Sequence, residues 1–138
     1  MDGMLWLLLA LLGVPLAGAV AAGVGRARAA PTVAAMAALI TAVLGVSAVL
    51  FAYPQGAAFR AGGLPWLPGG SGEGLFGLAI DPLSSIMVLV ITVIGFLVVL
   101  YSTEYLSPRH AEHPVKEGAQ RYYFWLLLFV MAMVGVAL

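Results

Sequence analysis

Charged residues divide the chain into four long uncharged stretches, at residues 3–25, 29–59, 82–103 and 122–138. A helix rises about 1.5 Å per residue, so roughly 20 residues cross a hydrocarbon core about 30 Å thick. Each stretch therefore predicts one transmembrane helix. The second stretch holds only one crossing, because Pro54 and Gly56 break it near its end. We expect helices at about 4–25, 32–53, 82–103 and 122–138.

The first and last stretches each need a further comment. A cleaved signal peptide is an alternative for the first, because Ala17, Gly18 and Ala19 resemble a small-residue cleavage site. The segment before it carries Asp2 and no basic residue, and its apolar run exceeds the usual length of about 7–15 residues, so a membrane helix is favoured. The last stretch stops at Leu138 without a polar flank, which is typical of a chain cut at the end of a helix.

Composition supports an all-α integral membrane protein with a single helical bundle. Of the 138 residues, 63% are hydrophobic and 9% are charged, whereas a soluble domain carries about 25% charged residues. The excess apolar surface requires lipid as its solvent. The net charge of zero gives no general attraction to nucleic acid. Because cysteine is absent, disulfide frameworks, iron–sulfur clusters and cysteine zinc sites are excluded.

Basic residues predict the orientation in the membrane. The connection at 26–31 and the connection at 104–121 together hold five of the six Lys and Arg residues, and only Arg60 lies in the second connection. Cytoplasmic loops are enriched in Lys and Arg. We therefore expect loops 26–31 and 104–121 in the cytoplasm and both termini on the outer side of the cytoplasmic (inner) membrane.

The long connection between the second and third helices predicts a small outer-face β-hairpin. Residues 64–67 and 75–80 are two short apolar segments around a glycine-rich turn at 69–72. An irregular interfacial loop anchored by Trp66 stays open as the alternative.

The third helix has clear landmarks at both ends. Asp81 is a helix-capping residue, Pro82 suits the first helical position, and Ser84 follows three residues after the cap. Tyr101 and Tyr105 are four residues apart, on one face of the other end. Such a pair fits an interfacial aromatic belt.

The fourth helix begins with Tyr122, Tyr123 and Trp125, which we assign to the same belt. On the first helix, Gly18 and Ala22 form a pair of small residues four positions apart, a spacing that favours close helix packing.

The most polar loop offers little catalytic chemistry. His110 and His113 with Glu112 are the only histidine-containing cluster, but their spacing differs from the zinc-protease motif and neighbouring prolines argue against one rigid helix. A solvated loop is therefore favoured over a metal site. Both histidines lie outside the predicted helices, which argues against axial haem ligation. We expect no catalytic residue, no cofactor and no metal.

The middle of each predicted helix lacks titratable side chains. A proton path through a membrane normally uses Asp, Glu, Lys or His facing the bundle interior. In the first three helices the interior polar side chains are the hydroxyls of Thr41, Ser47, Ser84, Ser85 and Thr92. This segment alone therefore cannot relay protons by acid–base steps, and the residues by themselves favour a packing or scaffolding role.

A succession of short motifs adds a family resemblance. Residues 81–84 (DPLS), 101–106 (YSTEYL), 121–125 (RYYFW), 128–129 (LF) and 131–135 (MAMVG) follow one another in order. From residue 76 to the end, this succession resembles the N-terminal part of the antiporter-like subunits. Those are the large proton-pumping membrane subunits of respiratory complex I, Mrp-type sodium/proton antiporters and energy-converting membrane hydrogenases.

The resemblance implies an N-terminal segment, or a naturally split piece, of a subunit in a multi-subunit complex that translocates protons or exchanges sodium for protons. Its expected partners are the lipid bilayer and other membrane subunits. Family members are far longer, and their functional glutamate and lysines lie on later helices with no counterpart here. The chain is therefore not expected to be catalytic alone. The alternatives are a small structural or assembly subunit without transport activity, and an unrelated four-helix membrane anchor.

Structural and interface roles are expected at the positions that fit these motifs: Asp81, Ser84, Tyr101, Glu104, Tyr105, Arg121 and Tyr122. We assign them to helix capping, interfacial anchoring and packing. Glu104 and Arg121 have opposite charges at the cytoplasmic edge, so we expect them to pair with each other or with a neighbouring subunit.

Overall fold

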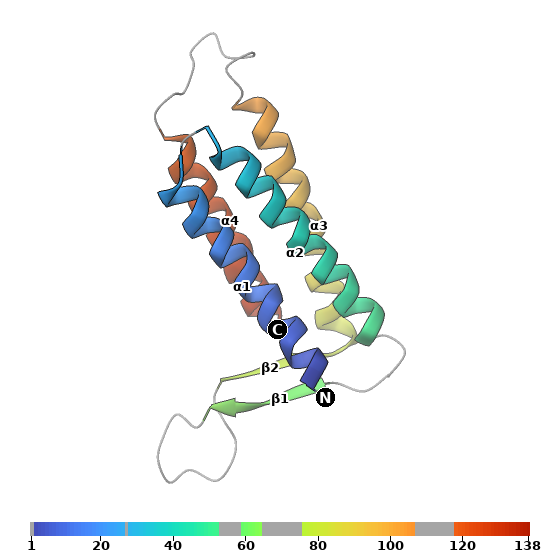
Figure 1. The fold of residues 1–138 in the computed structure, drawn as a ribbon. Helices are drawn as coiled ribbons and strands as arrows, with labels where there is room; N and C mark the ends of the chain where they lie inside the picture. The colour runs from blue at the N-terminus through green and yellow to red at the C-terminus, as the bar shows by residue number, and fades with distance from the viewer. Residues whose placement is uncertain (1, 27, 53–58, 65–75, 107–117) are drawn as a thin grey trace.

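The computed structural model describes residues 2–26, 28–52, 59–64, 76–106 and 118–138. It contains four long helices, α1 (Asp2–Val24), α2 (Ala30–Ala52), α3 (Pro82–Tyr105) and α4 (Ala119–Ala137) (Figure 1). By length and composition, all four are able to cross a membrane. The prediction of an all-α membrane fold with four spans is confirmed.

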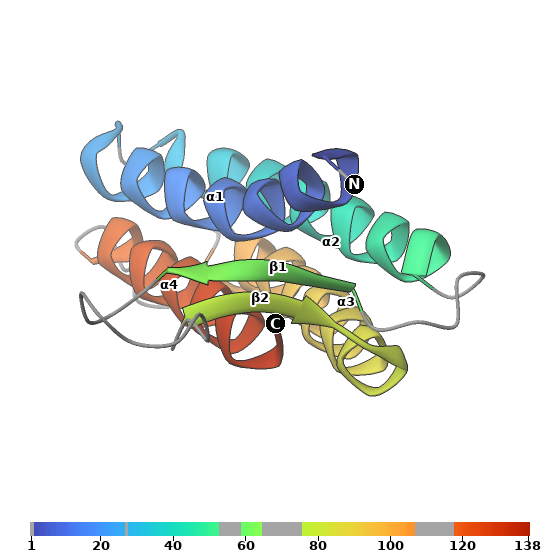
Figure 2. The same cartoon turned by 90° about the horizontal axis from the view of Figure 1, so that it is seen from below.

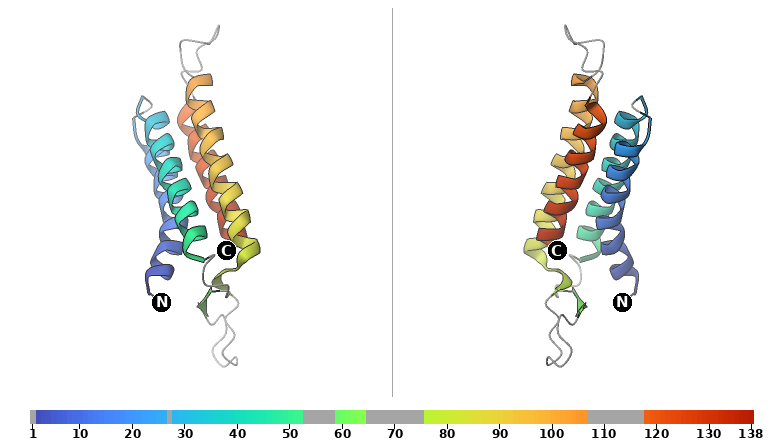
Figure 3. Two further views of the ribbon diagram at one scale, coloured as in Figure 1. Left: turned by 90° about the vertical axis from the view of Figure 1, so that its right-hand side faces the viewer. Right: turned by 90° about the vertical axis from the view of Figure 1, so that its left-hand side faces the viewer.

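The helices run up and down in two layers. One layer holds α1 and α2, and the other holds α3 and α4 (Figures 2 and 3). Both termini lie at the end of the bundle that carries the two strands, which we call the strand end. The end of α1, the start of α2, the end of α3 and the start of α4 lie at the opposite end. We call this the arginine end, because Arg26, Arg28 and Arg121 lie there.

Helix α4 begins three residues before the expected position. Gly118 is its N-terminal cap residue, with a left-handed φ of 116° that favours glycine, and Tyr122 N–H donates to the Gly118 carbonyl at 2.9 Å. The additional turn brings Gln120 and Arg121 into the helix, whereas the sequence placed both in the preceding loop.

The two strands, β1 (Phe59–Leu64) and β2 (Phe76–Ile80), form an antiparallel pair. The predicted β-hairpin is therefore confirmed in its pairing, but its first strand was placed too late, at 64–67. The strand ends at Leu64 because Pro65 has no N–H to donate to a strand neighbour. The proposed turn at 69–72 and the anchor residue Trp66 lie outside the described residues.

Strand β2 is attached to the strand end of the bundle. Ala79 N–H donates to the carbonyl of Leu138, just beyond α4, at 2.7 Å. The next residue, Ile80, is buried against Leu8 of α1 and Ala48 of α2. The bond satisfies one of the carbonyls that a helix C-terminus leaves without a partner. The strand pair therefore connects three helices at this end.

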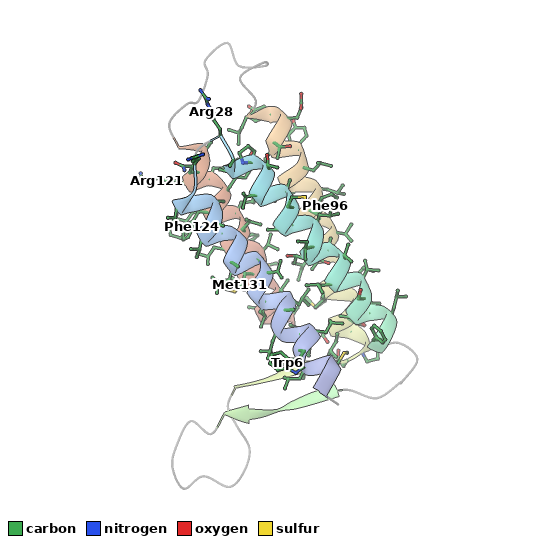
Figure 4. The ribbon with its side chains drawn as sticks, in the orientation of Figure 1. Trp6, Arg28, Phe96, Arg121, Phe124 and Met131 are labelled. Atoms are coloured by element: carbon green, nitrogen blue, oxygen red, sulfur yellow. The ribbon has the colours of Figure 1, made fainter. Side chains whose placement is uncertain are left out.

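The bundle core is built mainly from alanines. Its largest cluster of buried residues comprises Ala19, Ala22, Ala30, Ala34, Ala37, Ala38, Val99, Tyr123 and Leu127. Small side chains let helix backbones approach closely, and this packing replaces the hydrophobic driving force that is missing between helices in lipid. Many of the larger apolar side chains, among them Trp6, Ile94 and Phe129, are exposed on the outside (Figure 4). This inverted distribution fits a bundle whose solvent is lipid.

Candidate functional site

At the strand end, Asp81 and Ser84 form a reciprocal cap on α3. The Asp81 carboxylate accepts from Ser84 N–H at 2.6 Å, and the Ser84 hydroxyl oxygen accepts from Asp81 N–H at 2.8 Å. Pro82 occupies the first helical position. The bond from Ser84 N–H, together with the Ser84 hydroxyl, lowers the pKa of Asp81 because both stabilise the charged carboxylate. Asp81 is therefore a charged helix cap at neutral pH.

Inside the bundle, four hydroxyl side chains are buried but remain bonded within their own helices. Thr41, Ser85, Thr92 and Ser102 donate to the carbonyls of Ala37, Pro82, Val88 and Val98, at 2.7–2.8 Å. Such back-bonding satisfies a hydroxyl within its own helix. Of the four, Ser102 also bonds to Tyr122 of α4. The buried hydroxyls are therefore satisfied within the described bundle.

Helices α2 and α3 pack tightly where Gly45 meets Thr92. A Cβ at Gly45 would lie 2.4 Å from Thr92 Oγ1, closer than real atoms approach. A larger residue at position 45 would therefore force Thr92 or the two helices to shift.

At the arginine end, a hydrogen bond links α3 to α4. Ser102 Oγ and Tyr122 Oη lie 2.9 Å apart. Tyr101 and Tyr105 lie on the outside of α3, with their rings stacked at a centroid distance of 5.9 Å, and both are 70% exposed. This exposed aromatic pair has the form of an interfacial belt.

The seven predicted site residues fall into two groups. Asp81 and Ser84 lie at the strand end, about 30 Å from Tyr101 by the rise of the helix between them. The remaining five lie at the arginine end: Tyr101, Glu104, Tyr105, Arg121 and Tyr122. Glu104 and Arg121 are both exposed, and their pairing stays a prediction.

Sequence reasoning missed two features of the arginine end. The Gln120 side-chain amide donates to the Gly25 carbonyl, which joins the first turn of α4 to the end of α1. Tyr123, which we placed in the aromatic belt, is instead buried, with 1% exposure. The helical period explains this correction, because Tyr123 shares the inward stripe of α4 with Leu127, Val130 and Val134. That stripe was the available signal for Tyr123, whereas nothing in the sequence pointed to Gln120.

The described residues support packing rather than acid–base chemistry. No group of three His, Cys, Asp or Glu residues in this part of the chain is placed to hold a metal ion. The loop cluster of His110, Glu112 and His113 lies outside the described residues. Within the helices, charged side chains occur only near the ends, at Asp2, Glu104 and Arg121.

Comparison with known proteins matches part of this arrangement to a family model. Residues 66–123 match the family model described as NADH-ubiquinone oxidoreductase (complex I), chain 5 N-terminus. The match includes the Asp81 cap, all of α3 and the first five residues of α4. Over these residues the chain is similar to the antiporter-like membrane subunits of the complex I family. The predicted resemblance is thereby confirmed, although this match begins ten residues earlier than we expected and does not extend to residues 124–138.

Named relatives agree with that similarity. The putative antiporter subunit mnhA2 of Staphylococcus aureus strain JH9 is 41% identical over 61 residues, which cover 44% of this chain and 7% of the relative. The same protein from strains USA300 and COL gives the same values. The chain therefore spans a small fraction of the length of the curated relatives it matches.

Proposed function

We propose that this chain is the N-terminal segment, or a naturally split piece, of a subunit in a membrane complex that translocates protons or exchanges sodium for protons. The observation that carries the proposal is the family match over residues 66–123, which includes α3 and its cap. In this proposal the four helices form an outer wall of the translocating subunit. Other helices of the complex supply the titrating side chains, because the described helices carry none at membrane depth.

Deletion of this chain from its native membrane tests the proposal. We expect inside-out vesicles from the deletion strain to lose the pH gradient that sodium addition or NADH oxidation generates in wild-type vesicles, measured by quenching of a pH-sensitive dye. The intact chain on a plasmid is the matched control. A deletion strain with unchanged gradients from both energy sources would contradict the proposal. An intact-mass spectrum from the purified complex tells a split subunit near 14.3 kDa from the front of a longer one.

A structural or assembly subunit is the second candidate, and the absence of titratable side chains from the middle of the described helices favours it. The two candidates predict different values of one quantity, the pH gradient generated per assembled complex. If deletion lowers the amount of complex but leaves the gradient per remaining complex unchanged, the assembly role is supported and the translocating role fails.

The orientation proposed from the basic residues places the arginine end in the cytoplasm and both termini outside the cytoplasmic membrane. It is supported by Arg26, Arg28 and Arg121, which lie at one end of the bundle. The chain has no cysteine, so a single introduced cysteine reports its own location.

In intact cells we expect a membrane-impermeant maleimide to label Gly3→Cys and to spare Ala29→Cys. Both positions are exposed, and a side chain at Gly3 meets nothing within 4 Å. Inside-out vesicles should give the reverse pattern. Labelling of Ala29→Cys alone in intact cells would invert the proposed topology.

A further inference from the structure

The arginine end brings the segments that carry three arginines close to the start of α4. The bond from Gln120 to the Gly25 carbonyl holds the first turn of α4 against the end of α1. Arg121 follows Gln120 directly, and Arg26 follows Gly25. Arg28 lies in the tight turn between α1 and α2, where Ala29 N–H donates to the Arg26 carbonyl at 2.8 Å. Figure 4 shows Arg28 and Arg121 at this end of the bundle. Two chain segments about 95 residues apart in sequence thus contribute to one basic surface.

The helix start at this surface adds further positive potential. The N-cap residue of α4 is Gly118, which has no side chain that could cap the first N–H groups. The first N–H groups of a helix have no partner within the helix, and the helix dipole places partial positive charge on them. A helix start of this kind attracts anions. The three arginines are all exposed, and none forms an ion pair within the described part of the chain.

The level of this surface relative to the membrane is marked by aromatic side chains. Trp125 follows Arg121 by four residues, so the two share a face of α4. Trp125 is 64% exposed and Tyr122 is 42% exposed. Exposed Trp and Tyr side chains occupy the boundary between lipid tails and headgroups. Arg121 therefore lies about one turn further out, at the level of the headgroup phosphates.

We propose that Arg26, Arg28, Arg121 and the start of α4 bind the phosphate of an anionic phospholipid headgroup. A guanidinium matches a phosphate with two parallel N–H donors, and an anionic leaflet supplies phosphates at this level. Charge complementarity selects this occupant over a zwitterionic lipid. The described carboxylate at this end, Glu104, lies on α3, whereas the basic surface is formed by α4 and the α1–α2 turn. The proposal rests on the helices crossing the membrane and is independent of ion translocation.

Photo-crosslinking in the native complex tests the proposal. The complex is placed in lipid nanodiscs with phosphatidylglycerol that carries a photoreactive group beside its phosphate, or with matching phosphatidylcholine. Labelled peptides are then mapped by mass spectrometry. We expect phosphatidylglycerol to label the peptides around residues 24–30 and 118–125 several-fold more than phosphatidylcholine. Each arginine at an anionic surface adds roughly five-fold to lipid partitioning.

Three sets of arginine variants tell a loss of lipid binding from a failure of the complex to assemble. R26Q/R28Q/R121Q should reduce labelling by phosphatidylglycerol to the phosphatidylcholine level, and R26K/R28K/R121K should retain most of it. R60Q, which removes an arginine from β1 at the strand end, is the matched control and should change nothing. Equal labelling of the wild type by the two lipids would overturn the proposal, even where the glutamine variant fails to assemble. Loss of labelling in excess inorganic phosphate would assign the surface to free phosphate instead and would also overturn it.

Discussion

Replacement of Gly18 by alanine is expected to destabilise the bundle by about 2–3 kcal/mol, the upper part of the range for adding a methyl group to a packed core. A Cβ at Gly18 would lie 2.3 Å from Ala37 Cβ. Because Ala37 has no flexible side chain to turn away, the α1 and α2 backbones must separate. Unfolding of the purified complex in a sodium dodecyl sulfate titration, followed by the fluorescence of an introduced label on α1, measures the change.

Two further variants make this prediction specific. Gly18→Ala combined with Ala37→Gly moves the methyl group from one helix to the other. The nearest remaining atoms, Leu127 Cδ1 at 3.4 Å and Ala37 Cα at 3.8 Å, are at ordinary contact distances. The pair should therefore recover most of the lost stability. Gly13→Ala on the same helix meets nothing within 4 Å and should leave stability equal or slightly higher. A Gly18→Ala bundle as stable as the wild type would contradict the close α1–α2 packing.

Truncation of Tyr123 to alanine is expected to cost about 3 kcal/mol, at the lower end of the range for a buried aromatic side chain. Among the described residues its ring is the largest fully buried side chain, and it packs in the cluster formed with α1, α2 and α3. In lipid the loss comes from missing packing contacts rather than from exposure to water, which favours the lower value. The same detergent titration measures it.

Removal of the Tyr123 hydroxyl alone should not lower the stability of the bundle as truncation to alanine does. Tyr123 Oη is buried and has no hydrogen-bond partner in the described structure. Tyr123→Phe is therefore expected to be neutral or to stabilise the bundle by up to about 1 kcal/mol. Tyr122→Phe is the matched control, because it removes the 2.9 Å bond to Ser102 and should cost about 1 kcal/mol. A Tyr123→Phe variant less stable than Tyr122→Phe would show that the complex supplies a partner for the Tyr123 hydroxyl.

The Asp81 cap shows how much of the fold could be predicted locally. Asp81, Pro82 and Ser84 define the start of α3 through bonds between residues no more than three positions apart. Local bonds of this kind depend on neighbouring residues, so the printed sequence contains all the information they need. The same reasoning placed the second strand, because its apolar residues run directly into the cap.

Tyr122 and Tyr123 show what could not be predicted locally. Both are tyrosines at the start of α4, and the aromatic-belt rule treats them alike. One bonds to Ser102 of α3 and the other is buried among alanines of α1 and α2. Successive positions on a helix point about 100° apart, so the two side chains face different directions. What each one meets depends on where the other three helices lie. Gln120 was missed for the same reason, because its partner Gly25 lies just beyond the end of α1, 95 residues away in the sequence.

The sequence by itself determined that four apolar segments must cross the membrane, because only lipid can solvate so much uncharged surface and about 20 helical residues match its thickness. It also determined the start of α3 and, through a series of motifs, the resemblance to the antiporter-like family. Tertiary structure alone decided which small residues touch, where the α1–α2 turn meets the start of α4, and that β2 donates to the carbonyl beyond α4. Those contacts join segments far apart in the chain, and their distances depend on how the helices pack.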